Sequence, residues 1–336
     1  MKIGNFITTG IGSLPFTDPA EAVDFVLRSV DIPFWPQLPK RGFMENMYIQ
    51  FSEGIPGVMI DEKNGTLSID TSMADAAETE ALFNAYMEGR SERFALSPDH
   101  VASLQEFLGR RELSSFSCIK GQITGPLSFG LQVCDMERRP VLYDDVAFDI
   151  ALKALALKAE WQAEKLSSMN DNAILFVDEP FLSALGSAYV PLEDAQVVRS
   201  LDEIFSHVPC MKAIHCCGNT NWSLISKTKA DIISFDAYNY GKSFALYAQD
   251  IKAFLERGGI VAWGIVPASK DALNENADSL VARLNSILHE LASKGISMDA
   301  LRMQSMLTPS CGTGSLEMET SNKVFELLGQ VSRSMR

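Results

Sequence analysis

The side chains of this sequence best suited to chemistry are one histidine and two cysteines. His215 and Cys217 stand two positions apart at the end of a short apolar run, and Cys311 follows much later in the chain. Imidazole and thiolate are groups that zinc binds readily, and a catalytic zinc site takes three or four such ligands from distant parts of a fold. A structural zinc finger would instead pair its cysteines closely on both sides. The spacing therefore predicts a zinc site that leaves a position for substrate and activates a thiol.

Short β-rich apolar runs alternate along the chain with amphipathic runs whose apolar residues recur every three or four positions. Eight strands separated by helices is the count of a (β/α)8 (TIM) barrel, whose active site forms at the carboxyl ends of the strands. An open doubly wound sheet is the alternative that the pattern alone leaves open. The predicted strands are residues 6–12, 32–35, 116–123, 173–178, 211–215, 232–236, 260–265 and 303–307. The clearest predicted helices are residues 19–30, 146–166, 192–205, 245–256 and 280–292.

One region interrupts this alternation after the second predicted strand. Residues 57–70 contain Asn64 and Gly65 between alternating apolar and polar residues, a pattern that predicts a β-hairpin. Helical stretches at 72–90 and 100–112 follow before the third barrel strand. The sequence has no internal repeat and no linker rich in Gly, Pro or Ser, so we expect residues 1–336 to form a single catalytic barrel domain with this insertion.

Polar or small residues follow almost every predicted strand where it ends. In a barrel these positions converge on one mouth, so residues far apart in sequence can share a metal ion. Their concentration at one end of the strands is harder to explain by packing than any single motif is. The residues concerned are Ile11 and Ser13 after the first strand, Thr124-Gly-Pro126 after the third, Asp178-Glu-Pro180 after the fourth, His215 and Cys217 after the fifth, Asp236 after the sixth and Cys311 after the eighth.

Each of these residue types also has a structural interpretation. Cysteine is among the most often buried residues, and Cys118, Cys134, Cys210 and Cys216 are expected to fill the core. An aspartate at a strand end often caps the next turn, which is the alternative for Asp236. Asp178-Glu-Pro180 likewise suits a turn followed by a proline. The remaining histidines, His100, His207 and His289, are expected at the surface.

Composition and charge narrow the classes of partner. The chain has 336 residues, of which 46% are hydrophobic and 21% charged, as in an ordinary soluble globular protein. Its net charge of −14 argues against nucleic acid or an anionic membrane as partner, because both select basic surfaces. No apolar run reaches the roughly 18 residues of a membrane span, and the N-terminus lacks the apolar stretch of a signal peptide. Six cysteines in this length do not form a disulfide framework, so we expect a reduced, cytoplasmic location.

Taken in order, these strand-end motifs resemble the catalytic barrel of cobalamin-independent methionine synthase. That barrel belongs to the uroporphyrinogen decarboxylase/methionine synthase superfamily, which also includes zinc-dependent corrinoid methyltransferases. The resemblance runs from about Thr8 to Gly314 and lies in the shared order and strand-end placement of short motifs.

The resemblance implies a role for each matching residue. It implies that His215, Cys217 and Cys311 are zinc ligands, with Asp236 where the family has a glutamate as fourth ligand. It also implies that Ile11 and Ser13 hold the amino-acid end of homocysteine. Asp178 is implied to pair with the ammonium group of that substrate.

The chain also departs from the family pattern in ways that bear on the methyl donor. The folate-using enzyme is a double barrel, and 336 residues leave no room for its N-terminal half. The family's tryptophan of the folate site falls at Gln132, and its proton-donating histidine falls near Ser269. The stretch from Trp35 to Arg41 lacks the second acid that clamps the homocysteine ammonium. Gln37, Arg41 and Glu45 are the residues near this stretch that offer other contacts.

The sequence and the resemblance together predict a zinc-dependent methyltransferase that methylates a bound thiol, with homocysteine giving methionine. A methyl-corrinoid, presented by a partner corrinoid protein, is the expected donor, because its cobalt leaves without needing a proton. One alternative is a methyltransferase for another thiol, such as coenzyme M. A second is a zinc- or corrinoid-binding protein without turnover. A porphyrin decarboxylase is disfavoured, because that branch needs neither His215-x-Cys217 nor Cys311.

Overall fold

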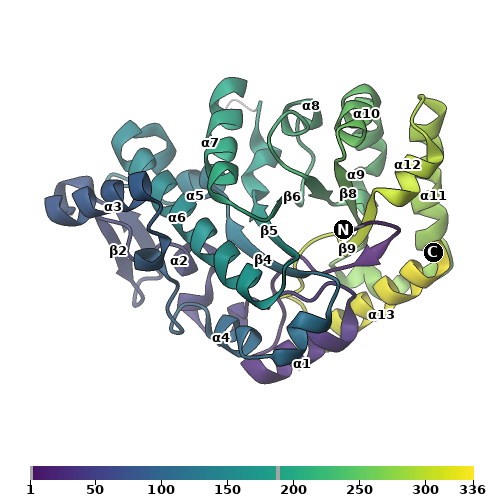
Figure 1. The fold of residues 1–336 in the computed structure, drawn as a ribbon, viewed down its shortest axis with the longest axis horizontal. Coiled ribbons are helices and arrows are strands. Elements are labelled where there is room, and N and C mark those ends of the chain that lie inside the picture. The colour runs from purple at the N-terminus through teal and green to yellow at the C-terminus, as the bar shows by residue number, and fades with distance from the viewer. Residues whose placement is uncertain (1–2, 187–189) are drawn as a thin grey trace.

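A sheet of seven parallel strands curls through the molecule, with helices packed around its outside (Figure 1). The structure is a computed structural model and describes residues 3–186 and 190–336. Neighbouring strands follow the order β1-β9-β8-β7-β6-β5-β4, so from β4 onward each barrel strand pairs with the next along the chain, and β9 pairs with β1. The strands are β1 Ile7–Thr8, β4 Ile119–Thr124, β5 Ala173–Asp178, β6 Met211–Cys216, β7 Ile232–Phe235, β8 Ile260–Val266 and β9 Ser305–Pro309.

The segment 32–37 lies between the two edge strands, β1 and β4, and closes the sheet. The N–H of Ile32 donates to the carbonyl of Thr8 at 2.9 Å, and the N–H of Lys120 donates to the carbonyl of Pro33 at 2.8 Å. Phe34 and Lys120 form a parallel bridge. The prolines of this segment have no N–H to give to a ladder, so the predicted second strand is present only as isolated bridges. The predicted (β/α)8 barrel is confirmed, with the irregular segment 32–37 in the place of its second strand.

Helices cover the outer face of the sheet between successive strands (Figure 1). α6 is the longest, with 25 residues, and its Ala-, Leu- and Lys-rich sequence combines high helix propensity with a wide buried face. The carboxylate of Asp144 caps its first turn by accepting from the N–H groups of Val146 and Ala147. The barrel helices are α1 Pro19–Ser29, α5 Pro126–Gln132, α6 Asp145–Met169, α7 Asp194–His207, α8 Trp222–Ile225, α9 Ala237–Phe244, α10 Ala248–Glu256, α11 Ala277–Ser293, α12 Met298–Met303 and α13 Met318–Met335.

Side chains alternate along each strand between two separate apolar clusters. On β5, Leu175 and Val177 join the large cluster that the helices cover, whereas Ile174 and Phe176 join a small cluster inside the barrel. Successive strand residues point to opposite faces, so the next inward position after Phe176 is Asp178, at the carboxyl end. This alternation directs polar side chains into the mouth of the barrel.

The predicted hairpin insertion is confirmed and lies at one end of the molecule (Figure 1). β2 (Val58–Asp61) and β3 (Thr66–Ile69) pair antiparallel, and Gly65 takes a positive φ of 65° in the turn between them. The helical stretches after it are shorter than predicted. Asp75 caps α3 (Ala76–Glu88), and α4 spans Ala102–Leu108. A further short helix, α2 (Met47–Gln50), precedes the hairpin.

The third strand, β4, begins at Ile119 and not at the predicted Phe116. Two other predicted strand boundaries are wrong for identifiable reasons. The last strand begins at Ser305 because Met303 ends α12. The first is only two residues long because the chain after Thr8 turns into the loop that carries Ile11 and Ser13. None of the helices in the described residues is both long enough and apolar enough to cross a membrane.

Candidate metal and thiol site

The structure brings His215, Cys217 and Cys311 together. On β6, the side chains of Ala213 and His215 occupy successive inward positions, and Cys217 lies just beyond the end of that strand. Cys311 follows β9, on the far side of β7 and β8 in the sheet. One ligand atom of each residue lies within 4.8 Å of the other two, and no other trio of such ligands is found in the part of the chain described. The three residues can therefore touch one ion.

His215 is held in an orientation that suits a metal ligand. Its Nδ1 lies 3.0 Å from the hydroxyl of Ser234, which stands opposite it on β7. Its Nε2 is buried and has no hydrogen-bond partner. Ligating histidines commonly use their second ring nitrogen for such an outer contact, which fixes the ring. The free Nε2 and the two thiols fit a zinc ion, and Ser234 was not predicted from the sequence.

The two thiols differ in their electrostatic surroundings. The neighbouring thiol of Cys311 and the ring of His215 lower the pKa of Cys217 to about 4. The pKa of Cys311 is raised, because it lies beside the sulfur of Cys217 and is itself buried. The thiolate that these surroundings favour at Cys217 is the form that binds metals.

A cavity of about 230 Å³ opens onto these three residues. It brings the predicted metal ligands and the predicted substrate-binding residues into one space. The lining residues are Ile11, Ser13, Gln37, Pro39, Glu45, Asn46, Met47, Asp178, Pro180, His215, Cys217, Cys311 and Gly312.

Asp178 offers this cavity an unused acceptor. Its side chain is 7% exposed, and its Oδ1 has no hydrogen-bond partner. Burial raises its pKa to about 6, against the opposing effect of His215 and of the Lys120 ammonium. A buried carboxylate without a donor is costly, so the site is suited to a ligand that brings a cationic donor.

Lys120 supports the loop that carries Ile11. Its ammonium is fully buried, donates to the carbonyl of Ile11 at 2.7 Å and to Oε1 of Gln122 at 2.9 Å, and lies 4.4 Å from the ring centroid of Phe176. Burial lowers its pKa to about 7. Sequence reasoning missed this residue, although a lysine inside an apolar strand was the available signal.

The loops that carry Ser13 and Cys311 lie directly against each other. The N–H of Thr313 donates to the carbonyl of Ser13 at 2.8 Å. A Cβ on Gly312 would lie 2.2 Å from the hydroxyl oxygen of Ser13. Only glycine permits this approach, which joins the loop that carries Ser13 to the loop that carries Cys311.

Asp236 is not among the three residues whose ligand atoms gather. Its carboxylate accepts from the N–H of Asn239 at 2.9 Å and from the side-chain amide of Asn239 at 2.7 Å, and so caps α9. It also lies outside the lining of the cavity. The capping role considered from the sequence is present, and its role as fourth ligand stays a prediction.

Glu179, next to Asp178, has a structural role. Its carboxylate accepts from the N–H groups of Leu127 and Ser128 at 2.9 and 2.7 Å, at the start of α5. A Cβ on Gly125 would lie 2.2 Å from Cδ of Glu179, which accounts for the glycine of Thr124-Gly-Pro126. The Asp178-Glu-Pro180 and Thr124-Gly-Pro126 motifs therefore pack directly against each other.

The segment that lacks the expected second acid places another acid in the cavity. Glu45 is 4% exposed and lines it, together with Gln37. Gln50 connects them, since its Nε2 donates to Glu45 and its Oε1 accepts from Gln37, each at 2.7 Å. Arg41 contacts Glu45 at 3.4 Å from outside the cavity lining. Burial raises the pKa of Glu45.

Three of the remaining cysteines and histidines lie as expected. Cys118 and Cys216 are buried in the core, and His289 is exposed. Cys134 and Cys210 are half-buried where core positions were predicted, and His207 is half-buried where a surface position was predicted. The expectation for His100 is wrong, because it is 8% exposed and packs beneath the insertion.

Comparisons with known proteins identify the fold. No known family matches the chain, and no curated protein matches it. Among solved structures, a B12-independent methionine synthase from Shewanella sp. W3-18-1 in complex with selenomethionine is 16% identical, with a TM-score of 0.59 over 98% of this chain and 97% of that one. A methyltransferase from Methanosarcina mazei is also 16% identical, with a TM-score of 0.59 over 98% of this chain and 93% of that one. The chain thus shares, over nearly its whole length, the barrel fold of the methionine synthase that its motifs resemble.

Proposed function

We propose that this chain is a zinc-dependent methyltransferase that transfers a methyl group to the sulfur of a bound thiol. The convergence of His215, Cys217 and Cys311 on the cavity that holds Asp178 carries the proposal. Two thiolates and an imidazole are the protein ligands of a catalytic zinc ion, with a position left for a substrate. The names of the two solved structures, a methionine synthase and a methyltransferase, support the same chemistry.

The residues of the chain would divide the work between activation and alignment. When bound, zinc would hold a substrate thiol as thiolate at neutral pH, although a free alkyl thiol has a pKa of about 8.5. Ser234 fixes the ring of His215, and Cys217 supplies a preformed thiolate. Methyl transfer is an in-line displacement, so holding the sulfur in place accounts for much of the catalysis.

Homocysteine is the acceptor that the cavity favours. The unpaired Oδ1 of Asp178 and the carboxylate of Glu45 both suit the ammonium group of an amino acid. Coenzyme M carries a sulfonate and no ammonium, so these two acids would repel it. A volume of about 230 Å³ suits a small amino acid.

A methyl-corrinoid delivered by a partner corrinoid protein is the donor that we propose. Transfer from methylfolate requires an acid, because its leaving nitrogen must gain a proton, whereas a cob(I)alamin leaves without one. Gln132 and Ser269, at the family's folate and proton-donor positions, do not line the cavity. This residue pattern favours a donor that needs no proton.

Metal analysis and a donor assay test the proposal together. We expect one zinc per chain in the wild type and in the control Cys134→Ala, and none in Cys311→Ala. With homocysteine, stopped-flow absorbance should show thiol-dependent loss of methylcobalamin. Coenzyme M in place of homocysteine should react much more slowly. A wild type without zinc, or one with zinc that is inert with methylcobalamin and methylfolate and every thiol, would overturn the assignment, the latter in favour of a binding protein.

A further inference from the structure

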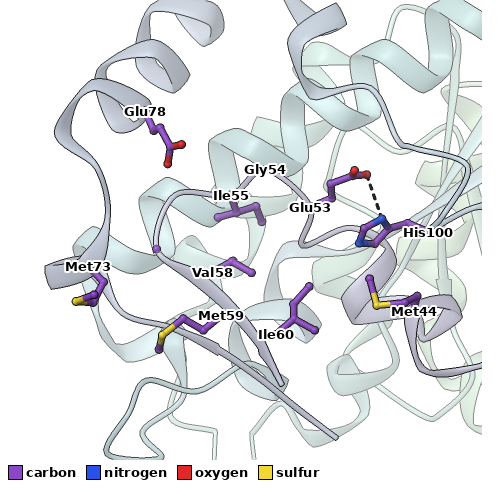
Figure 2. Close-up of a pocket in the computed structure, with 11 residues that line it drawn as sticks. Met44, Glu53, Gly54, Ile55, Val58, Met59, Ile60, Met73, Glu78 and His100 are labelled. Atoms are coloured by element: carbon purple, nitrogen blue, oxygen red, sulfur yellow. Dashed lines mark ion pairs between the residues drawn. The ribbon is translucent and has the colours of Figure 1, made fainter. Parts of the chain in front are cut away.

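A second, larger cavity lies under the hairpin insertion and shares no lining residue with the metal site (Figure 2). Its volume is about 610 Å³, within the range of roughly 300–1,000 Å³ typical of small-molecule sites. Its middle is apolar, formed mainly by Ile55, Val58, Met59 and Ile60. Polar groups stand only at its two sides (Figure 2).

His100 provides an unsatisfied acceptor at one side of this cavity. Its Nδ1 lies 3.4 Å from the Glu53 carboxylate and 3.1 Å from the hydroxyl of Ser97 (Figure 2). A carboxylate only accepts, so the proton of the neutral ring belongs on Nδ1 and Nε2 carries the lone pair. Nε2 is buried and has no partner, in a residue only 8% exposed. A ligand that donates a hydrogen bond would satisfy it.

The Lys158 ammonium is attracted by Glu53. It is fully buried without a hydrogen-bond partner, and burial lowers its pKa to about 8 against that attraction. The Glu53 carboxylate also contacts Nδ1 of His100, which leaves Nε2 of that ring for another partner. The geometry of this side of the cavity is therefore prepared for a donor.

Glu78, on α3, stands at the opposite side (Figure 2). Its carboxylate is separated from that of Glu53 by the apolar middle. A metal ion is disfavoured in this cavity. Within the described ranges, the group of His, Cys, Asp or Glu side chains close enough to share an ion is His215, Cys217 and Cys311. An apolar surface between an acceptor nitrogen and two acids suits an organic cation.

We propose that this cavity is a second binding site, for an aliphatic ammonium compound. Its ammonium donates to Nε2 of His100 beside Glu53, its hydrocarbon chain covers Ile55, Val58 and Ile60, and a second amine, where present, reaches Glu78. Recognition of the head group depends on His100 and Glu53, and selection of diamines depends on Glu78.

Proton–carbon correlation spectra of the full chain, which has four histidines, test this directly. We expect pentylamine to shift one histidine signal, the signal that is absent from His100→Asn. Pentylamine should bind about tenfold more tightly than pentanol, whose hydroxyl donates to Nε2 but carries no charge for Glu53. Pentanoate, which has no donor at neutral pH, should bind more weakly than either. Cadaverine, the diamine counterpart of pentylamine, should bind about threefold more tightly than pentylamine, the modest gain of an exposed ion pair.

Matched variants separate this site from general effects on the fold. His100→Asn should weaken amine binding about tenfold and His289→Asn should not. Glu78→Gln should abolish the preference for cadaverine, whereas Glu80→Gln on the same helix should preserve it. Equal affinity for pentanol and pentylamine, or no histidine shift at millimolar amine, would overturn the proposal. These measurements need neither zinc nor turnover, so they do not depend on the proposed methyl transfer.

Discussion

The candidate metal site and the cavity under the insertion both contain a histidine beside an oxygen partner, yet different structural elements support them. His215 sits on a barrel strand, where the alternation of side chains fixes its direction and brings it to Cys311 from distant sequence. His100 precedes the short helix α4, and its direction depends on local contacts with Ser97 and Glu53. The comparison shows that parallel strands place chemistry by a regular rule, whereas an insertion places it by individual contacts.

The same contrast extends to the ligands that each region suits. The first site gathers two thiols and an imidazole around a small cavity, whereas the second sets an imidazole and two carboxylates at the sides of an apolar one. A metal ion needs several ligand atoms within a few ångströms, but an extended organic cation needs acceptors that stand apart. We therefore expect variants in the two regions to affect different ligands.

The largest effect should come from Cys217→Ser compared with its neighbour Cys216→Ser. Cys217 lines the cavity, whereas Cys216 joins the outer core and is 1% exposed. We expect Cys217→Ser to lose bound zinc and to lower methyl transfer more than about a thousandfold, since a hydroxyl is a poor zinc ligand. Cys216→Ser should retain zinc and lose about 1–3 kcal/mol of stability from burying a hydroxyl. Zinc content and urea unfolding measure both, and equal zinc loss in the two variants would contradict the side-chain directions.

Asp178→Asn should have the next largest effect, and it should weaken binding of the thiol substrate without affecting zinc. We expect KM for homocysteine to rise about a hundredfold, the cost of losing a buried charge pair, while zinc stays bound. Since burial raises the pKa of Asp178 to about 6, its charge is lost as pH falls through that value, and kcat/KM should fall with it. In Asp178→Asn, the pH profile of kcat/KM should lack this fall at acidic pH. A profile unchanged by the substitution would assign the fall to another group.

Ser234→Ala should weaken the metal site without removing a ligand. The variant frees the ring of His215 to rotate, and such outer contacts are worth roughly 10- to 100-fold in metal affinity. Competition with a chromophoric chelator gives this affinity. Thr308→Ala provides a control, because that hydroxyl is buried near the mouth of the barrel without a hydrogen-bond partner. Equal affinities for the Ser234 variant and the wild type would remove Ser234 from the site.

Gly312→Ala should disturb the substrate loop by a smaller amount. The added Cβ meets the hydroxyl of Ser13, so the loop must shift, and we expect KM for homocysteine to rise about tenfold. The double variant Gly312→Ala with Ser13→Gly should recover most of the loss, because the colliding atom is gone. Additive effects in this cycle would show that the two loops act independently.

The barrel, the hairpin insertion and the strand-end residues were predictable because they follow from periodicity. The alternation of side chains along each strand places Asp178 and His215 in the mouth of the barrel, and the order of the motifs places Cys311 beside them. Ser234 and Lys120 escaped prediction because their roles depend on which strand or loop stands opposite, a property of register that sequence spacing does not contain. His100 escaped for the same reason, since its burial arises from the packing of the insertion. Glu45 was named with Gln37 and Arg41 as a residue that offers other contacts, and the structure places Glu45 and Gln37, but not Arg41, in the cavity lining.

The smallest effect should appear where the two regions meet. The segment 44–47 separates them, with Met44 lining the amine cavity and Glu45 and Met47 lining the thiol cavity. Glu45 is held by Gln50 and by the N–H of Ala102, which follows His100 closely. These contacts hold the segment 44–47 in place from both sides. We therefore expect saturating pentylamine to change KM for homocysteine by less than about threefold, which is below the five- to 150-fold change of typical allosteric coupling. A larger change that Gln50→Ala abolishes would instead make the segment a transmitting element, with the amine acting as a regulator of the thiol site.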